Sequence, residues 1–284
     1  MVKKDEKQPD LQEGIEYWTS QPASYNGVLG GFGEGSLPRI DALGSRQFLQ
    51  FILPNLCSVA SAVRLLTPSP PSHGKRLRAL DVGAGVGRVT SDTLLPLFDD
   101  VVLVEPVEPF VREALARARA SKNGTVAADA PYAPWRGIRE QTKSVTIIQG
   151  TLQSLDPAHP ASGECKRLGR VGYVPLETDS GFDVIWCQWC LGHLSDEELV
   201  AFFRRCHAAL RNKDEGLIVV KENLCQDGDD GSARVSFDEA DSSLTRSDAA
   251  WKKTFVKAGL TLIYEQLQLG FPEGLYDVKM YALR

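Results

Sequence analysis

A glycine-rich turn between a predicted strand and a predicted helix constrains the fold of this chain more than any other feature. The segment LRALDVGAGVGR at 77–88 runs from an apolar, strand-forming stretch into Gly83, Gly85 and Gly87. Glycines let the backbone turn tightly and allow a ligand to approach where a Cβ would collide. The helix N-terminus behind the turn offers free N–H groups to a polar or anionic ligand. The segment therefore predicts a ligand-binding strand–turn–helix unit.

The residues after this turn indicate the kind of ligand. A second predicted strand, at 100–104, ends in Glu105, about twenty residues on, where an acid can accept both ribose hydroxyls of a nucleoside. A dinucleotide fingerprint requires G-x-G-x-x-G, but here the third glycine comes one place early and Arg88 holds the final position. The spacing therefore disfavours an NAD-linked oxidoreductase and favours a nucleoside cofactor over a purely structural turn.

Composition narrows the class of protein. The 284 residues, 43% hydrophobic and 24% charged, suit one large soluble α/β domain with appendages. No apolar run approaches the ~20 residues of a membrane span, and the polar start MVKKDEKQPD lacks the apolar core of a signal peptide. A net charge of −5 argues against a dedicated nucleic-acid binder. Six scattered cysteines indicate a reducing compartment, so we expect the cytosol or the nucleus.

Strand and helix patterns alternate along most of the chain. The predicted strands are 77–82, 100–104, 144–149, 181–190, 216–223, 260–268 and 275–283. The predicted helices between them are 88–98, 109–120, a helix capped by Ser195 with Glu198 completing a capping box, and a helix at 245–260 closed by Gly259. This alternation predicts an α/β fold, a doubly wound, mostly parallel, seven-stranded Rossmann-like sheet. The last two strands suggest a hairpin with an antiparallel strand at the sheet edge.

The chain before the sheet is predicted to be a helical extension. Residues 1–10 read as a disordered tail. Tyr17 and Trp18 are adjacent aromatics that suit either a packing anchor or a lid over a pocket. A glycine-rich loop follows, and Asp41 reads as the cap of an amphipathic helix at 42–56. We therefore divide the chain into a tail, lid and helical extension at 1–76 and a core domain at 77–284.

Three segments read as insertions, and the sequence assigns them no function: 67–76, 119–144 and 156–180. The Asp-rich segment after the fifth strand reads as a further loop. Ligands of doubly wound folds bind beyond the carboxyl ends of the strands. The stretches WCQWCLGH and KEN, together with Glu105, fall at that edge. The C-x-x-C spacing of Cys187 and Cys190 is not surrounded by a thioredoxin-like pattern, so a redox or metal role is disfavoured.

Several blocks of the sequence resemble the protein N-terminal methyltransferase family, which methylates the α-amine of proteins that begin X-Pro-Lys once the initiator Met is removed. The resemblance runs from Tyr17 to Arg284 and is most specific in WCQW–GHL and D-x-x-D-S-S. The other shared blocks are YW, V-L-G-G, R-x-F-L-Q, ALD-GAG-GR-T, LLPLF, RRC, K-E-N and the closing Y-x-V-x-x-x-ALR. Relatives often carry Asp at the position of Glu105 and read K-D-N where this chain reads K-E-N.

This resemblance implies S-adenosylmethionine (SAM) as the cofactor and assigns roles to matching positions. Arg88 is expected to reach the SAM carboxylate, Glu105 to hold the ribose, and Gln188 to close over the cofactor. The full cofactor-binding set implied is Gly83, Gly85, Arg88, Glu105, Leu152, Gln153, Gln188 and Trp18. The substrate-binding set implied is Trp189, Asp238, Tyr276, Leu29 and Gly30.

Methyl transfer to an amine requires a neutral nitrogen, yet an N-terminal amine has a pKa near 7.7–8.0. Asp241 and His193 are the candidate general bases, and Asn223 is expected to hold the amine or the first peptide carbonyl. Trp189 is expected to tolerate methylated ammonium groups through cation–π attraction. Asp238 is expected to pair with the substrate's third-position Lys. Each residue also has a structural interpretation: His193 as a capping histidine, the two acids as solvated loop residues, and Trp189 as core.

Two other functions remain open at this level. One is a small-molecule amine or hydroxyl methyltransferase on the same fold, which needs no acidic channel for Lys. The other is a non-catalytic methyltransferase-like scaffold, against which the intact Gly83–Arg88 turn argues. By resemblance, ribosomal proteins are expected among the substrates. We expect a monomer that binds neither nucleic acid nor a membrane.

Overall fold

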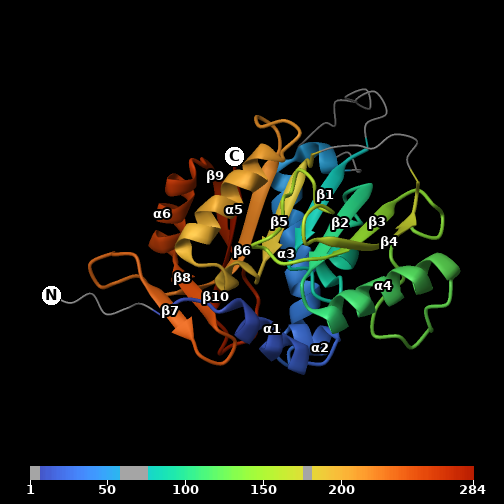
Figure 1. Ribbon diagram of the computed structural model, residues 1–284, viewed down its shortest axis with the longest axis horizontal. Helices are drawn as coiled ribbons and strands as arrows, with labels where there is room; N and C mark the ends of the chain where they lie inside the picture. The colour runs from blue at the N-terminus through green and yellow to red at the C-terminus, as the bar shows by residue number, and fades with distance from the viewer. Residues whose placement is uncertain (1–6, 58–75, 175–180) are drawn as a thin grey trace.

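One mixed sheet of ten strands organises the computed structural model, which describes residues 7–57, 76–174 and 181–284 (Figure 1). The strands are β1 (Arg78–Val82), β2 (Asp100–Glu105), β3 (Ser144–Gln149), β4 (Lys166–Gly172), β5 (Val184–Gln188), β6 (Leu217–Cys225), β7 (Val235–Asp238), β8 (Ser243–Ser247), β9 (Leu262–Leu267) and β10 (Asp277–Leu283). The order across the sheet is β4-β3-β2-β1-β5-β6-β10-β9, and β8, paired with β7, joins at the end of β6.

The seven strands predicted from the sequence occupy consecutive positions in this sheet. The pairs from β3 through β2, β1 and β5 to β6 are parallel, whereas β10 is antiparallel to both β6 and β9. The predicted closing hairpin is therefore confirmed. The register sets Val82 beside Val104 and Cys187, and Gln188 beside Lys221. The carboxyl ends of these strands consequently meet at one edge of the sheet.

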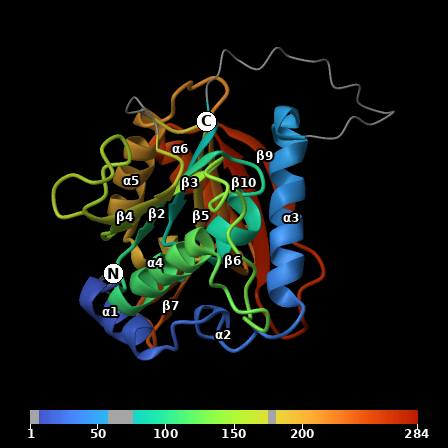
Figure 2. The ribbon, with the colours of Figure 1, turned by 90° about the vertical axis from the view of Figure 1, so that its right-hand side faces the viewer.

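Alternate residues of the central strands point into two separate hydrophobic cores. The main helices are α3 (Leu37–Ile52), α4 (Glu108–Asn123), α5 (Asp196–Ala208) and α6 (Asp248–Ala258). Leu80 and Val82 pack on the side of α5 and α6, whereas Ala79 packs on the side of α3 and α4. Figure 2 shows α3 and α5 on opposite sides of the sheet. Helices on both faces of a mostly parallel sheet confirm the doubly wound fold.

The predicted helix ends of α5 and α6 are confirmed. Ser195 caps α5, and its capping box with Glu198 is complete. Gly259 follows α6 with φ of 79°, the left-handed conformation that ends a helix at a glycine. None of the helices in the described part of the chain has the length and apolar character that a bilayer crossing requires.

The chain before the sheet forms α1 (Leu11–Ser20), α2 (Tyr25–Val28) and α3, which agrees with a helical extension. Asp10 caps α1, and Lys7 forms an ion pair with Glu239. Residues 7–10 are therefore held in place, contrary to the predicted disordered tail. Residues 1–6 lie outside the described residues.

The prediction that Asp41 caps a helix is wrong. α3 spans Leu37–Ile52, so it begins five residues before the predicted start at 42, with Ser36 at its N-cap position and Pro38 in its first turn. Proline is favoured there because its missing N–H would have no partner in the helix. Asp41 consequently lies inside α3, where it is fully buried.

Two segments that read as loops contain strands. Within 156–180, β4 pairs antiparallel with β3, although 175–180 lies outside the described residues. The Asp-rich segment after β6 contains the β7–β8 hairpin. β7 is mostly exposed, so its sequence lacks the apolar alternation that marks a strand. The insertion at 119–144 begins inside α4 and is irregular from 124 to 143, and most of 67–76 lies outside the described residues.

The helix predicted at 88–98 is only partly confirmed. After the glycine turn the chain forms a short helical segment that becomes a π-helix over Thr90–Leu94. The N–H of Leu95 donates to the carbonyl of Thr90 over 2.9 Å, which closes the wider turn. π-Helical turns are rare and tend to occur at functional sites.

Candidate active site

Two cavities meet at the carboxyl edge of the sheet. The first has an empty volume of about 890 Å³ and the second about 1090 Å³. Four residues line both cavities, which therefore adjoin there: Trp18, Val28, Trp189 and His193. Two adjoining cavities suit a transfer reaction in which donor and acceptor meet at the junction.

The glycine turn and Glu105 form one wall of the first cavity. Gly83 has φ of 63°, and a Cβ on it would lie 2.4 Å from the Cβ of Cys190, so only glycine fits there. The Glu105 carboxylate accepts hydrogen bonds from the N–H of Gly85 over 2.7 Å and of Val107 over 2.8 Å. Burial raises the pKa of Glu105 to about 7. The predicted ribose-binding acid is thus fixed against the predicted glycine turn.

Arg88 belongs to a buried network of charges. Its Nη1 donates to Oδ2 of Asp41 over 2.6 Å, and Nζ of Lys221 lies 2.6 Å from Oδ1 of Asp41. Nε2 of Gln188 also donates to Asp41, over 2.9 Å. Burial opposes the charge on Asp41, but the two cations outweigh it and lower its pKa to about 2. Because two cations share one carboxylate, the net positive charge suits an anionic ligand group at Arg88.

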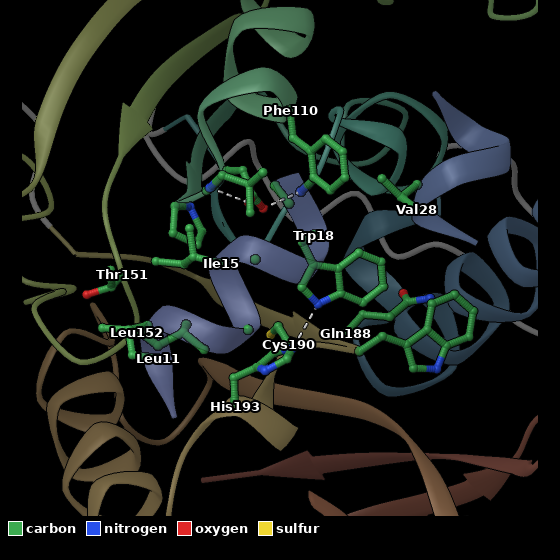
Figure 3. Close-up of a pocket in the computed structure, with 18 of the residues that line it drawn as sticks. Leu11, Ile15, Trp18, Val28, Phe110, Thr151, Leu152, Gln188, Cys190 and His193 are labelled. Carbon is green, nitrogen blue, oxygen red and sulfur yellow. Dashed lines mark hydrogen bonds between the residues drawn. The ribbon is translucent and has the colours of Figure 1, made fainter. Parts of the chain in front are cut away.

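One face of α1 closes the first cavity. Leu11, Gly14, Ile15 and Trp18 follow the i, i+3, i+4, i+7 spacing of one helix face and line the cavity. Leu11, Ile15 and Trp18 are labelled in Figure 3. Of the two interpretations of the N-terminal aromatics, this arrangement favours the lid. A Cβ on Gly14 would lie 3.0 Å from Nδ1 of His193, so this mid-helix glycine lets α1 approach the junction of the cavities.

Apolar and amide side chains surround the rest of the first cavity. Leu152, Phe110 and Trp18 contribute flat or apolar surfaces, which suit a purine base (Figure 3). Nε2 of Gln153 donates to the carbonyl of His193 over 3.1 Å. This bond ties the segment after β3 to the junction of the two cavities. Gln188, at the end of β5, lines the same cavity.

His193 is held at the junction by Trp18. The indole Nε1 of Trp18 donates to Nε2 of His193 over 3.0 Å (Figure 3). Since the indole N–H can only donate, Nε2 is the acceptor and the neutral ring carries its proton on Nδ1. Burial lowers the pKa of His193, and the carboxylate of Asp241 opposes that shift. In this arrangement Nε2 becomes available as a base only when Trp18 releases it.

Asp241 lines the second cavity, and one of its carboxylate oxygens is buried. Its Oδ1 has no hydrogen-bond partner among the residues that the structure describes. A buried carboxylate oxygen without a partner is costly, which favours a cationic or N–H group of a ligand at this position. Asn223, near the end of β6, lines the same cavity and adds an amide that can donate and accept.

Trp189 connects the cavities in a strained backbone conformation. Its φ is 54°, unusual for a residue with a side chain and typical of functional sites. Its N–H donates to the carbonyl of Lys221 over 3.1 Å, which holds this conformation. The ring of Phe271 lies 6.2 Å from the indole, and both line the second cavity. The pair offers aromatic surface to a substrate entering from that side.

The structure brings together all but one of the residues predicted for the site. The eight predicted cofactor-binding residues line the first cavity. The three predicted catalytic residues line the second, together with Trp189, Tyr276, Leu29 and Gly30. Asp238 differs: it is exposed at the end of β7, accepts a hydrogen bond from the N–H of Ala240, and lies outside the lining of both cavities. Its proposed contact with a substrate Lys stays a prediction.

Sequence reasoning missed several residues that build the site. Asp41 was expected to cap a helix, and Lys221 and Glu222 of KEN received no individual role. Oε1 of Glu222 accepts from the N–H of Cys190 and of Leu191, each over 3.0 Å, and so fixes the turn that carries Trp189 and His193. A signal existed, because a Lys on the apolar strand LIVVKEN must be buried beside an acid to be tolerated.

The chemistry of the first cavity fits SAM, the cofactor expected from the sequence. Arg88 offers a cation to a carboxylate, Glu105 offers an acid at the predicted ribose position, and the apolar walls suit adenine. The glycine turn leaves its backbone accessible between these groups. The carboxylate, the ribose and the adenine of SAM therefore each have a matching surface in the first cavity.

Comparisons with known proteins agree with this interpretation. A model of the family described as AdoMet-dependent proline di-methyltransferase matches residues 5–129 and 140–284. Alpha N-terminal protein methyltransferase 1 of Schizosaccharomyces pombe is 35% identical over 271 residues, which cover 95% of this chain and 94% of that protein. The N-terminal Xaa-Pro-Lys N-methyltransferase 1 of Homo sapiens is 33% identical over 284 residues, 100% of this chain and 98% of that protein.

Solved structures show the same fold. A SAM-dependent methyltransferase of Leishmania major superposes with a TM-score of 0.64 at 30% identity, over 96% of this chain and 82% of that chain. An N-methyltransferase of Burkholderia thailandensis with bound S-adenosylhomocysteine gives a TM-score of 0.55 at 17% identity, over 99% of this chain and 92% of that chain. The second likeness concerns the fold alone.

Proposed function

The chain belongs to the AdoMet-dependent proline di-methyltransferase family and is a SAM-dependent methyltransferase, and we propose that it methylates the α-amine of proteins that begin Xaa-Pro-Lys. The observation that carries the substrate proposal is the buried, unpartnered Oδ1 of Asp241 on the wall of the second cavity, within the part of the chain that the structure describes. A protonated N-terminal amine supplies the cationic N–H donor that this oxygen lacks.

The first cavity holds the cofactor in this proposal. Arg88, supported by Asp41 and Lys221, binds the carboxylate, and Glu105 binds the ribose. When bound, SAM supplies an electrophilic methyl group on a sulfonium. Trp18 and α1 cover the cavity and exclude water from it. The cofactor and the amine then meet at the junction of the two cavities, which Trp18, Trp189 and His193 line.

Asp241 and His193 divide the proton chemistry. Asp241 orients the incoming ammonium, because its Oδ1 has no hydrogen-bond partner among the described residues and Asp241 lines the second cavity. His193 accepts a proton at Nε2 after the hydrogen bond from Trp18 opens. Asn223 holds the amine or the first carbonyl of the peptide. Each further methylation requires one more deprotonation, so the same groups act repeatedly.

The outer part of the second cavity suits a proline at the second position of the substrate. Leu29, Phe271 and Tyr276 line it with apolar surface, and Tyr276 is 56% exposed at its mouth. Proline has a fixed φ and no N–H, so a shaped apolar slot can select it without an acceptor for that donor. Asp238 is proposed to attract the third-position Lys from outside the slot.

Mass spectrometry of short peptides tests this function. The protein is incubated with SAM and a Ser-Pro-Lys peptide, beside an N-acetylated copy and a Ser-Gln-Lys copy. We expect methyl masses on the free Ser-Pro-Lys peptide alone. Methylation of the acetylated copy would contradict α-amine chemistry, and equal methylation of Ser-Gln-Lys would contradict selection of proline.

The cellular setting follows from the substrate class. We propose ribosomal proteins with a suitable N-terminus as substrates, and a monomeric enzyme acting in the cytosol or nucleus. Six free cysteines support a reducing compartment.

A further inference from the structure

The irregular segment 130–139 is set apart by both sequence and packing. The family model matches on either side of these ten residues and leaves them out. The segment nevertheless buries two large apolar side chains, Trp135 at 2% exposure and Ile138 at 0%. Both belong to the core between the sheet and the α3–α4 side. Because Trp135 and Ile138 are buried in this core, residues 130–139 are held in a fixed position against the sheet and α4.

Trp135 packs against the turn that binds the cofactor. A Cβ on Gly87 would lie 2.7 Å from Cζ2 of Trp135 and 3.0 Å from Cη2. Gly87 has φ of 80°, so both its conformation and its contact with the indole require glycine. The backbone N–H of Trp135 donates to Oγ of Ser121 over 2.9 Å, which anchors the segment on α4.

Arg117 of α4 forms a second contact with this segment and also contacts α2. The guanidinium of Arg117 lies 4.3 Å from the ring centre of Tyr132 and 5.0 Å from that of Tyr25. Tyr25 begins α2, and its hydroxyl donates to Oδ1 of Asp92 in the π-helical turn over 3.3 Å. Arg117 itself is 3% exposed. Arg117 therefore links the segment to α2, and Tyr25 links α2 to the π-helical turn.

The glycine turn is thus confined from two directions. On one side Gly85 faces Val28 of α2, since a Cβ on Gly85 would lie 3.3 Å from Cγ1 of Val28. On the other side Gly87 faces Trp135. We propose that Trp135 is a positioning residue for the cofactor: it holds the glycine turn in its binding conformation through contact with Gly87.

The physical reason is preorganisation. A turn of several glycines has many accessible conformations, and fixing one of them costs entropy. A turn that is already held by a buried indole loses less freedom when a ligand binds, so the affinity is higher. Nε1 of Trp135 has no hydrogen-bond partner among the described residues, so the indole acts through its apolar surface. Phenylalanine should replace it better than alanine.

The inference rests on the proposed cofactor site, and calorimetric titration of the full chain with S-adenosylhomocysteine tests it. We expect Trp135→Ala to raise the Kd at least about tenfold and Trp135→Phe to stay within about threefold of wild type. Trp135→Leu keeps more of the buried volume and serves if the alanine variant does not fold. Ile138→Ala is the matched control, because Ile138 is buried in the same segment and core.

Ile138→Ala should lower the thermal midpoint of unfolding yet leave the Kd within about threefold of wild type. The proposal is overturned if Trp135→Ala, or Trp135→Leu in its place, binds as wild type does, or if Ile138→Ala weakens binding as much. S-adenosylhomocysteine binding needs no peptide. Failure of the wild type to methylate Ser-Pro-Lys would therefore count against the proposed substrate and not against the role of Trp135.

Discussion

The indole N–H of Trp18 donates to Nε2 of His193 over 3.0 Å, across 175 residues of sequence. The bond joins the lid helix α1 to the turn after β5, and both residues line both cavities. In the proposed mechanism, closure of the first cavity by α1 and the availability of His193 as a base are therefore linked. Opening this bond releases the acceptor lone pair on Nε2.

Trp18→Phe should raise the pKa of His193 by about half a unit or more, because a hydrogen bond to the neutral ring disfavours protonation and the smaller ring also relieves burial. Nitrogen NMR titration of His193 measures this pKa. In the wild type the same spectra should show the proton on Nδ1. Tyr17→Phe is the control, since no hydrogen bond joins Tyr17 to His193 in the described structure. A wild-type spectrum with the proton on Nε2 would rule the arrangement out.

Asp241→Asn should lower kcat by about a hundredfold, because the amine is then no longer oriented toward the methyl group and misplaced reactants cost about that much. The substitution keeps the shape but removes the charge that the ammonium meets. Asp214→Asn, an exposed carboxylate in the turn before β6, should leave kcat unchanged. Single-turnover methylation of Ser-Pro-Lys measures both variants. An unchanged rate in Asp241→Asn would exclude Asp241 from the chemistry.

Asp238→Asn should raise the KM for Ser-Pro-Lys by a few fold and leave kcat unchanged, because an exposed charge pair contributes about 1 kcal/mol at most. The effect should disappear for a Ser-Pro-Gln peptide and at high salt. Steady-state kinetics with the two peptides at two ionic strengths measure it. An equal rise in KM for both peptides would show that Asp238 does not contact the third residue.

The elements that were predicted correctly are those whose sequence signals lie within a few neighbouring residues. The glycine turn, the capping box of Ser195 and Glu198, and the closing glycine at Gly259 are each encoded within a few neighbouring residues. The strand–helix alternation then leaves few arrangements, which is why the doubly wound sheet and the edge that carries the site followed from sequence.

Contacts between distant segments could not be predicted in the same way. An Asp before an apolar helix reads as a cap, whereas the ion pair of Asp41 with Arg88 depends on where α3 lies. The unpartnered oxygen of Asp241 is likewise a property of the packed loop. β7 was missed because its exposed residues show no apolar alternation. The family resemblance supplied the remaining site residues, whereas the matching family model leaves out residues 130–139.

Gly83→Ala should destabilise the protein by several kcal/mol and abolish SAM binding, because a Cβ at 2.4 Å from the Cβ of Cys190 forces the glycine turn away from the segment that follows β5. Gly163→Ala is a matched control: its φ of 60° is close to the 63° of Gly83, but nothing lies within 4 Å of its Cβ position. In Gly163→Ala the free energy of unfolding should fall only by the cost of placing alanine in the left-handed conformation, about 1–2 kcal/mol. Urea unfolding measures the free energy of unfolding of both variants. Equal losses would mean that the backbone strain at positive φ, and not the collision with Cys190, causes the destabilisation of Gly83→Ala.

The free energy of unfolding should fall as pH rises through the range near 7, in part because of Glu222. Burial raises the pKa of Glu222 to about 7, above the ordinary 4.5. Between these values the folded state binds more protons than the unfolded state, so the stabilisation is complete below 4.5 and is lost as pH rises through 7.

Glu222→Gln keeps an oxygen for the N–H groups of Cys190 and Leu191 but cannot ionise. Its unfolding free energy should exceed that of wild type at pH 8 by about 1–3 kcal/mol and match it near pH 4.5. Denaturant titrations at several pH values measure this difference, and parallel pH profiles for the two proteins would show that Glu222 stays ionised when buried.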